Sequence, residues 1–394
     1  MAYFAGNSLG LMPRSVRHAL DVELDSWQEH AVEGHFRGQN PWMHYHHICT
    51  PSLARLTGAL DEEVVCTNGL TANLHLMMVS FFRPQGDRNM ILMEAGAFPS
   101  DQYAVESQVR FHGLDPGRCV VELKPGAGRR CLTSRQISDA IQQYGARLAL
   151  VLMPGVQYQT GQVFDIGEIT RMGHEAGARV GFDLAHAVGN ISLNLHDWGP
   201  DFAVWCSYKY LNSGPGGPGG LFVHERHAHN PELPRFAGWW GHDESTRFEM
   251  QASFHPMRGA AGWQLSNAPV LGMAAHHASL EIFDRAGMDH LTERAAELSG
   301  YLRHRLVDIQ HRRGADALEL ITPHEPGSYG CQQSFSVGSH GEELLLSLQQ
   351  NGVLIDFRRP DILRMAPVPL YNQPEEIDHC CDLLDHWLSL HTKS

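Results

Sequence analysis

The sequence lacks a long apolar run, an excess of positive charge and any paired spacing of its cysteines. No apolar run approaches the roughly 20 residues that cross a bilayer, and the first residues lack the pattern of a secretory signal. A formal net charge of -14 argues against nucleic acid or an anionic membrane as a partner, because either would need a basic face. Eight scattered cysteines favour reduced thiols in a cytoplasmic protein. The expected partner is therefore a small molecule.

Histidine, by contrast, is abundant, and its densest cluster is His44-Tyr45-His46-His47. His44 and His47 could share one face of a helix, where two imidazoles can bind zinc. No cysteine partner and no HExxH pattern accompanies them, so a solvated or cleft-lining segment explains them better. The sequence therefore predicts no metal site.

Short apolar segments alternate with longer amphipathic ones from Glu63 onward. This alternation predicts an α/β fold in which helices flank an open, mostly parallel sheet. The expected strands are Glu63–Thr67, Met90–Glu94, Ala149–Met153, Arg179–Asp183, Phe202–Ser207 and Gly220–His224. The expected helices are residues 14–31, Thr71–Phe82, Gln102–Phe111, Ser134–Tyr144 and Ile166–Ala176.

The last third of the chain predicts a smaller α+β unit. A long helix over residues 268–310, broken near Gly287, would link this unit to the parallel sheet. Its strands are expected near Ser334–Val337, Val353–Phe357 and Leu363–Ala366, and a helix from Glu375 to His391 closes the chain.

An acidic residue ends one expected buried strand, and a lysine ends the next apolar run. Asp183 lies in the run from Ala178 to Leu184, and Lys209 closes the run from Phe202. In parallel sheets, ligands bind at the carboxyl ends of the strands, where both side chains would lie. Pyridoxal phosphate requires these two groups, a lysine to carry its aldehyde and a carboxylate to keep its pyridine nitrogen protonated. Taken alone, the pair could equally be a structural ion pair.

Several longer motifs in one order resemble the kynureninase family of pyridoxal-phosphate hydrolases, along nearly the whole chain. They are YFAGNSLGL at the start, AFPSD, DLAHAVGN, LHDWGPDFAVWCSYKYLNSGPGG, GWWGH, Ser266-Asn267 and RMAPVPLYN. The resemblance implies a fold type I pyridoxal-phosphate enzyme of the aspartate aminotransferase superfamily. It also implies a homodimer whose active site is shared between subunits. The implied reaction is hydrolysis of L-kynurenine, or its 3-hydroxy form, to an anthranilate and L-alanine, in tryptophan catabolism and NAD biosynthesis.

The resemblance also divides the chain. We expect an N-terminal segment of residues 1–45 that contributes to the active site, and a large pyridoxal-phosphate-binding domain of residues 46–267. Residues 268–394 would form the linking helix and the small C-terminal domain. Relatives carry a segment before the position of Gly6, so we expect a missing helix or a misassigned start.

The implied cofactor contacts follow the family motifs. A phosphate suits the N-terminus of the helix after Gly69, where Leu70 and Thr71 would meet it. Phe98 would stack on the pyridine ring, and His186 would bond to Asp183 or meet the phosphate. The full set is Leu70, Thr71, Phe98, Asp101, Asp183, His186, Tyr208, Lys209, Trp239 and Asn267, of which Trp239 and Asn267 would come from a second subunit.

The implied catalytic residues are Lys209, which moves the α-proton, Asp183, and Tyr208, which would exchange a proton at the side-chain carbonyl. Arg364 would clamp the substrate carboxylate, because a guanidinium offers two parallel donors. Arg358 and Arg359 compete for this role, but their place before Pro360 is typical of a solvated strand end. The candidates for the aryl end are Ser8, His35, Trp240, His242 and Asn267.

One departure and several alternatives stay open. Relatives place a serine or threonine near the cofactor where this chain has Pro154. A cysteine desulfurase or selenocysteine lyase shares the fold but needs a cysteine nucleophile on a mobile loop, for which Cys331 is the candidate. An aminotransferase is a further alternative. A non-catalytic pyridoxal-phosphate-binding regulatory protein is the alternative of another class.

Overall fold

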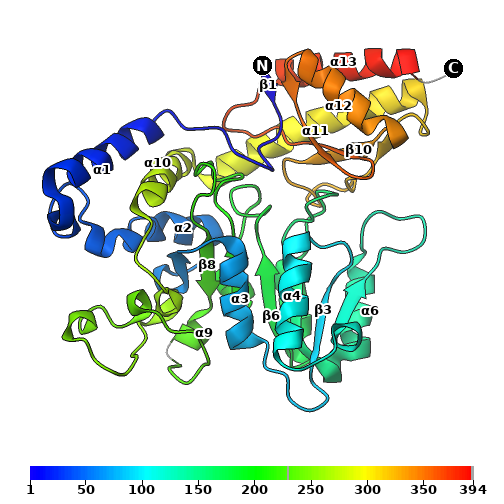
Figure 1. The fold of residues 1–394 in the computed structure, drawn as a ribbon. Coiled ribbons are helices and arrows are strands. Elements are labelled where there is room, and N and C mark those ends of the chain that lie inside the picture. Colours follow the sequence, from blue (N-terminus) through cyan, green and yellow to red (C-terminus); the bar gives the residue numbers. More distant parts are fainter. Residues whose placement is uncertain (229, 392–394) are drawn as a thin grey trace.

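The computed structural model describes residues 1–228 and 230–391, and a seven-stranded sheet forms its centre (Figure 1). The strand order is β2-β8-β7-β6-β5-β3-β4. Strands β4, β3, β5, β6 and β7 run parallel, and β8 pairs antiparallel with both β7 and β2. The strands are β2 (Val64–Cys66), β3 (Met90–Glu94), β4 (Val120–Leu123), β5 (Leu148–Pro154), β6 (Arg179–Asp183), β7 (Phe202–Trp205) and β8 (Gly220–Val223).

Both faces of this sheet are buried, which explains the near-continuous apolar runs of its strands. Side chains on one face pack against helices α3 (Leu70–Phe81) and α4 (Pro99–Phe111). The other face packs against α2 (Thr50–Thr57), α6 (Ser134–Tyr144), α7 (Ile166–Glu175) and α10 (Val270–Ala286). The mostly parallel sheet between two helical layers confirms the predicted fold class.

A second core lies in the C-terminal part of the chain. Strands β9 (Glu319–Leu320), β10 (Gln333–Ser336), β12 (Asp356–Arg358) and β13 (Ile362–Met365) form an antiparallel sheet in the order β12-β13-β10-β9. Helices α11 (Met288–Arg313), α12 (Gly341–Gln350) and α13 (Pro374–His391) pack on it. This is the α+β unit that the sequence predicted.

The start of the chain joins this C-terminal unit. Strand β1 (Ala2–Tyr3) pairs in parallel with β11 (Val353–Leu354), and Phe4 is fully buried in the second core. The chain then crosses to the large sheet, where α1 (Val16–His30) packs against α10 (Figure 1). The division at residues 45 and 267 stays a prediction.

The sequence prediction differs from the structure in several elements, including helices α2 and α12 and strand β9, which it missed. The expected strand Val353–Phe357 is two strands, because β11 pairs with β1 while β12 pairs with β13. Strand β4 was not predicted at all. The break near Gly287 is confirmed: α10 ends at Ala286, and Gly287 has a positive φ of 76° that glycine adopts without strain. None of the described helices combines the length and the apolar character that a membrane crossing requires.

Candidate active site

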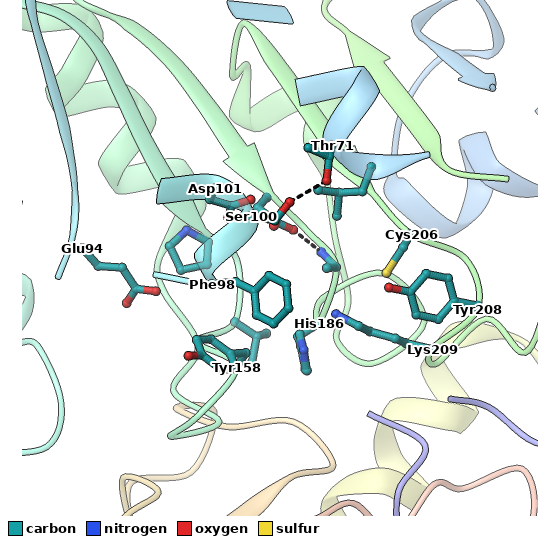
Figure 2. Close-up of a pocket in the computed structure, with 15 residues that line it drawn as sticks. Thr71, Glu94, Phe98, Ser100, Asp101, Tyr158, His186, Cys206, Tyr208 and Lys209 are labelled. Atoms are coloured by element: carbon teal, nitrogen blue, oxygen red, sulfur yellow. Dashed lines mark hydrogen bonds between the residues drawn. The ribbon is translucent and has the colours of Figure 1, made fainter. Parts of the chain in front are cut away.

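The carboxyl ends of β3, β5, β6 and β7 meet around one cavity, into which Lys209 projects (Figure 2). This is the edge where a parallel sheet gathers its ligands. The cavity brings together most of the predicted cofactor residues, namely Leu70, Thr71, Phe98, Asp101, Asp183, His186, Tyr208 and Lys209. The other lining residues are Glu94, Ser100, Pro154, Val156, Tyr158, Ala185 and Cys206.

Two buried carboxyl groups lie close together on the sheet side of the cavity. Asp183 ends β6, and its Oδ1 accepts a hydrogen bond of 2.7 Å from the N–H of Ala185. Asp101 is 7% exposed, and its Oδ1 has no partner among the described residues. Burial, followed by the charge and hydrogen bond of Asp183, raises the pKa of Asp101 well above its ordinary value. Such a pair favours a neighbouring cation, and a protonated pyridine nitrogen is a suitable one.

A helix N-terminus and two hydroxyl groups supply anion-binding groups at the same cavity. Helix α3 begins at Leu70 without a side-chain cap, so its first N–H groups have no partner within the helix. The hydroxyl of Thr71 lies 2.6 Å from that of Ser100 in the first turn of α4. Free helix N–H groups beside hydroxyls are typical of phosphate sites.

Aromatic side chains border the part of the cavity that lies between the two carboxyl groups and the N-terminus of α3. The ring centroid of Phe98 lies 5.8 Å from Nζ of Lys209, and Phe98 meets Tyr158 edge-on at 5.3 Å. Phe98 is 41% exposed and leaves a ring face open for stacking (Figure 2). The residues of the cavity therefore fit the aldehyde, the pyridine nitrogen, the ring and the phosphate of pyridoxal phosphate.

Two further lining side chains stay neutral at neutral pH. Burial, with the charges of Lys209, Arg364 and Arg358, lowers the pKa of His186 well below its ordinary value, and His186 Nδ1 has no partner in the described chain. Burial and the neighbouring Cys206 raise the pKa of Tyr208, so its hydroxyl keeps a proton. Both side chains can therefore donate hydrogen bonds into the cavity.

Glu94 is a lining residue that the sequence analysis did not select. It ends β3 and is 4% exposed, and Gln157 Nε2 donates to its Oε1 at 3.4 Å. Its signal was present, because an acid closing a predicted parallel strand lies at the ligand edge as Asp183 does. Burial raises the pKa of Glu94 to about 8, although the Gln157 hydrogen bond opposes the shift.

We expect the substitution Glu94→Gln to flatten the pH dependence of stability in cofactor-free protein. An unfolded glutamate releases its proton near pH 4.5, whereas folded Glu94 keeps it until about pH 8. The stability of the parent therefore falls as the pH rises from 4.5 to about 8. Melting temperatures from pH 5 to pH 9 would measure the effect, with Glu122→Gln at an exposed position of β4 as the control. Parallel curves for Glu94→Gln and the parent would contradict it.

Arg364 lies behind the cavity wall and does not line the cavity. It is fully buried, and its NH1 donates at 2.6 Å to the carbonyl of Tyr158, a lining residue. Its NH2 donates to Ser8 Oγ at 3.0 Å and pairs with Asp356. Ser8, expected at the aryl end, is thus placed beside the predicted carboxylate clamp.

Arg358 lies beside Ser8 and Asp356, so it is only partly solvated, and the predicted solvated strand end describes Arg359 better than Arg358. The NH2 of Arg358 donates to Asp356 Oδ2 at 3.1 Å and to Ser8 Oγ at 3.2 Å. Arg359, in contrast, is 83% exposed and pairs with Glu342. The two adjacent arginines therefore have different surroundings.

The other predicted substrate residues lie outside the cavity of this chain. Trp240 is 3% exposed, and the Cζ atom of Arg247 lies 4.4 Å from the centroid of its indole ring. His242 is 7% exposed, and its Nδ1 accepts the N–H of His255 at 3.1 Å. His35 is half-buried against Trp42. Neither Trp239, which is 50% exposed, nor the exposed Asn267 reaches the cavity.

Cys331 is a poor candidate for a nucleophile. It is 1% exposed, and its backbone N–H donates to Asn190 Oδ1 at 2.8 Å. Burial raises the pKa of its thiol to about 12, so the reactive thiolate is not formed at neutral pH.

Among the residues that the structure describes, two clusters have the composition of metal ligands, and neither lines the cavity. Exposed His44 and His47 lie 3.4 and 3.6 Å from Glu244 Oε2. In the other cluster, Glu63 faces His196 and His224, but its two oxygens already accept backbone N–H groups of Leu60 and Glu225.

Comparison with known proteins decides the family. Residues 291–384 match the model of the kynureninase C-terminal domain. The kynureninase of Xanthomonas campestris pv. campestris (strain B100) is 53% identical over 98% of this chain and 90% of its own length. That of Koribacter versatilis (strain Ellin345) is 54% identical over 94% of this chain and 86% of its own. The chain belongs to the kynureninase family.

Solved structures share the fold of this kynureninase-family chain at much lower identity. A mutant of the cystine C–S lyase C-DES, with glycine covalently linked to its PLP cofactor, has a TM-score of 0.80 and 17% identity, covering 98% of this chain and 96% of its own. A cysteine desulfurase from Thermococcus onnurineus NA1 has the same score and identity, covering 98% and 94%. The chain thus has the fold type I architecture of pyridoxal-phosphate enzymes, as predicted. Kynureninase-family membership and the buried Cys331 together disfavour a desulfurase.

Proposed function

We propose that the protein hydrolyses L-kynurenine, or 3-hydroxy-L-kynurenine, with pyridoxal phosphate as cofactor. The products are anthranilate, or its 3-hydroxy form, and L-alanine, with one water consumed per turnover. The observation that carries the proposal is the position of Lys209 and Asp183 in one cavity at the ligand edge of the sheet, in a chain of the kynureninase family. Intact Lys209, Asp183 and Arg364 argue against a regulatory protein without activity.

The cavity residues would hold the cofactor at several points. Lys209 Nζ would carry the aldehyde, and Asp183 would face the pyridine nitrogen and keep it protonated. The N-terminus of α3 with Thr71 and Ser100 would hold the phosphate, and Phe98 would stack on the ring. When bound, pyridoxal phosphate supplies a carbonyl for the substrate amine and a ring that withdraws electrons from the α-carbon.

The chain's own groups would then move protons and orient the substrate. Once released, the Lys209 amine would take the α-proton and later return a proton to the alanine portion. Tyr208, whose hydroxyl stays protonated, would serve the side-chain carbonyl. Arg364, beside Tyr158, would hold the α-carboxylate. Lys209 and Tyr208 line the cavity, whereas Arg364 lies behind its wall against Tyr158.

Turnover of both kynurenines by purified protein loaded with pyridoxal phosphate tests the proposal. We expect anthranilate fluorescence to increase with release of one L-alanine per substrate. Release of a keto acid would indicate an aminotransferase, and sulfide released from cysteine would indicate a desulfurase. Retention of the bound cofactor's colour without reaction with any amino acid would favour the regulatory alternative.

We expect Arg364→Lys to raise KM much more than it changes cofactor affinity. A point charge replaces a two-pronged donor, so roughly 1–3 kcal/mol of charge-assisted hydrogen bonding is at stake. Steady-state kinetics with L-kynurenine measure the change, and cofactor titration with a melting curve serves as the control. An unchanged specificity constant would show that the carboxylate clamp lies elsewhere.

We further infer that the protein is a homodimer with a shared active site. In one chain the cavity mouth is open at Phe98 and Thr71, and Trp239 and Asn267 stay exposed away from it. Large apolar side chains such as Trp27 and Phe36 are more than half exposed, at 62% and 63%. A second copy would cover such surfaces and supply the missing groups.

The eight cysteines are all free, which supports a cytoplasmic location.

A further inference from the structure

Arg358, Arg364 and Asp356 form a compact charged cluster on one face of the C-terminal sheet. In the register of β12 and β13, Asp356 lies directly opposite Arg364. Arg358 is two residues from Asp356 along β12, so both side chains point to the same face. The Oδ2 atom of Asp356 accepts from Arg358, Arg364 and Ser8 together. One carboxylate oxygen therefore holds two guanidinium groups.

The charges of this cluster do not balance. Two guanidinium groups and one carboxylate leave one positive charge, which a single carboxylate ligand would neutralise. The Nε atoms of Arg358 and Arg364 are both buried without a hydrogen-bond partner among the described residues. A buried donor without a partner costs free energy, so the cluster retains binding capacity that its own residues do not use.

The cluster is also adjacent to the cavity. Arg364 donates to the carbonyl of Tyr158, whose side chain lines the cavity. The charges of Arg358 and Arg364 both act on the cavity residues Tyr158 and His186. Arg364 has no exposed surface, whereas the side chain of Arg358 is 37% exposed. Arg358 is therefore the arginine of this pair that is accessible to a carboxylate in the solvent.

We propose that Arg358 is a second guanidinium of the substrate-carboxylate subsite, and that Asp356 is an internal carboxylate that occupies both arginines until a substrate carboxylate arrives. This inference rests on the proposed function for the identity of the substrate. The carboxylate of an α-amino acid would bind Arg358 first and then share Arg364 with Asp356. The uncompensated positive charge is the attraction that brings it there.

The test compares two adjacent arginines that differ in surroundings. Arg358→Gln and Arg359→Gln each remove one positive charge from the C-terminal sheet, but only Arg358 belongs to the cluster. The probes are L-alanine, the proposed product, and L-alaninamide, which has the same amine and side chain without the carboxylate. Binding of each to the holoenzyme is followed by the change in cofactor absorbance, so the assay needs no turnover of kynurenine.

We expect Arg358→Gln to weaken L-alanine binding about tenfold to hundredfold, as the loss of a charged hydrogen bond requires, and to leave L-alaninamide within about twofold. Arg359→Gln should change neither affinity. Arg358→Lys, which keeps the charge without the fork, should fall between the parent and Arg358→Gln. Equal losses for both probes, or no loss for L-alanine, would overturn the role of Arg358.

Asp356→Asn tests the second half of the proposal. If Asp356 stands in for the ligand, its removal frees both arginines, and L-alanine should bind at least as tightly as to the parent. Weaker binding would overturn this role and would mean that Asp356 only positions the arginines. Should the parent bind L-alanine but leave both kynurenines unchanged, the proposed function would fail while the subsite remained measurable.

Discussion

Lys209→Ala should abolish turnover and the covalent attachment of the cofactor while leaving the fold intact. Removing the amine takes away both the attachment point and the group that would move the α-proton, so the loss should exceed that of any other single substitution at the cavity. Activity with L-kynurenine measures the first effect. The visible absorption band of the parent, and its disappearance on borohydride reduction, measures the second.

The composition of the chain makes the attachment unusually easy to map. The sequence contains only Lys124, Lys209 and Lys393 as lysines. After borohydride reduction and proteolysis we expect the label on the peptide that contains Lys209. Lys124→Ala is the matched control and should keep both the colour and the activity. A label on Lys124, or the same colour in Lys209→Ala, would refute the assignment.

Asp201→Asn should destabilise the fold by about 3 kcal/mol or more, because it weakens several hydrogen bonds to one fully buried charged acceptor at once, and each such bond contributes about 1.5–3 kcal/mol. Asp201 is fully buried between β6 and β7, and it accepts from His174 at 2.9 Å and His227 at 2.7 Å. Arg179 and Arg226 pair with the same carboxylate, and the N–H of Val180 donates to it at 2.7 Å. The midpoint of urea unfolding would measure the loss.

The same carboxylate should make the fold sensitive to acid. Burial alone would raise the pKa of Asp201, but the hydrogen bonds of His174 and His227 and the charge of Arg226 outweigh it and hold the pKa well below its ordinary value of 3.8. Its stabilising effect is therefore complete above that value and is lost as the pH falls below it.

The control for Asp201 is Asp139→Asn. This substitution breaks an exposed pair with Arg135 on α6, and it should cost less than about 0.5 kcal/mol. If the two substitutions shifted the unfolding midpoint equally, the network around Asp201 would not hold β6 and β7 together.

Local patterns predicted the elements of the large sheet because its strands are short, apolar and bounded by turns. Strands β3 and β6 and helix α6 begin and end where the sequence placed them. Strand β4 was missed because half-buried Val120 and Val121 are followed by exposed Glu122, which breaks the apolar run. The split near Ile355 was missed because it depends on pairing with residues at the other end of the chain.

The site was predictable where chemistry follows a strand end, as at Asp183 and Lys209. It was less predictable where residues meet only through the fold. Tyr158 carries no local signal, and its place depends on the packing of the loop after β5 against Phe98 and Arg364. Ser8 and Arg358 are 350 residues apart in sequence, and no short motif joins them.

The crossing of the chain at residues 5 to 15 has a mechanical consequence. The chain passes between the two sheets at two points, here and at Gly287, and hydrogen bonds such as those from Thr322 to Thr160 and from Arg364 to Tyr158 hold the two parts together between these points. One of these points lies beside the cavity, because the N–H of Gly10 donates to the carbonyl of Tyr208 at 2.8 Å. The backbone next to Lys209 is therefore linked directly to the segment that leads to the C-terminal sheet, so strain applied to that sheet can be transmitted to the attachment lysine.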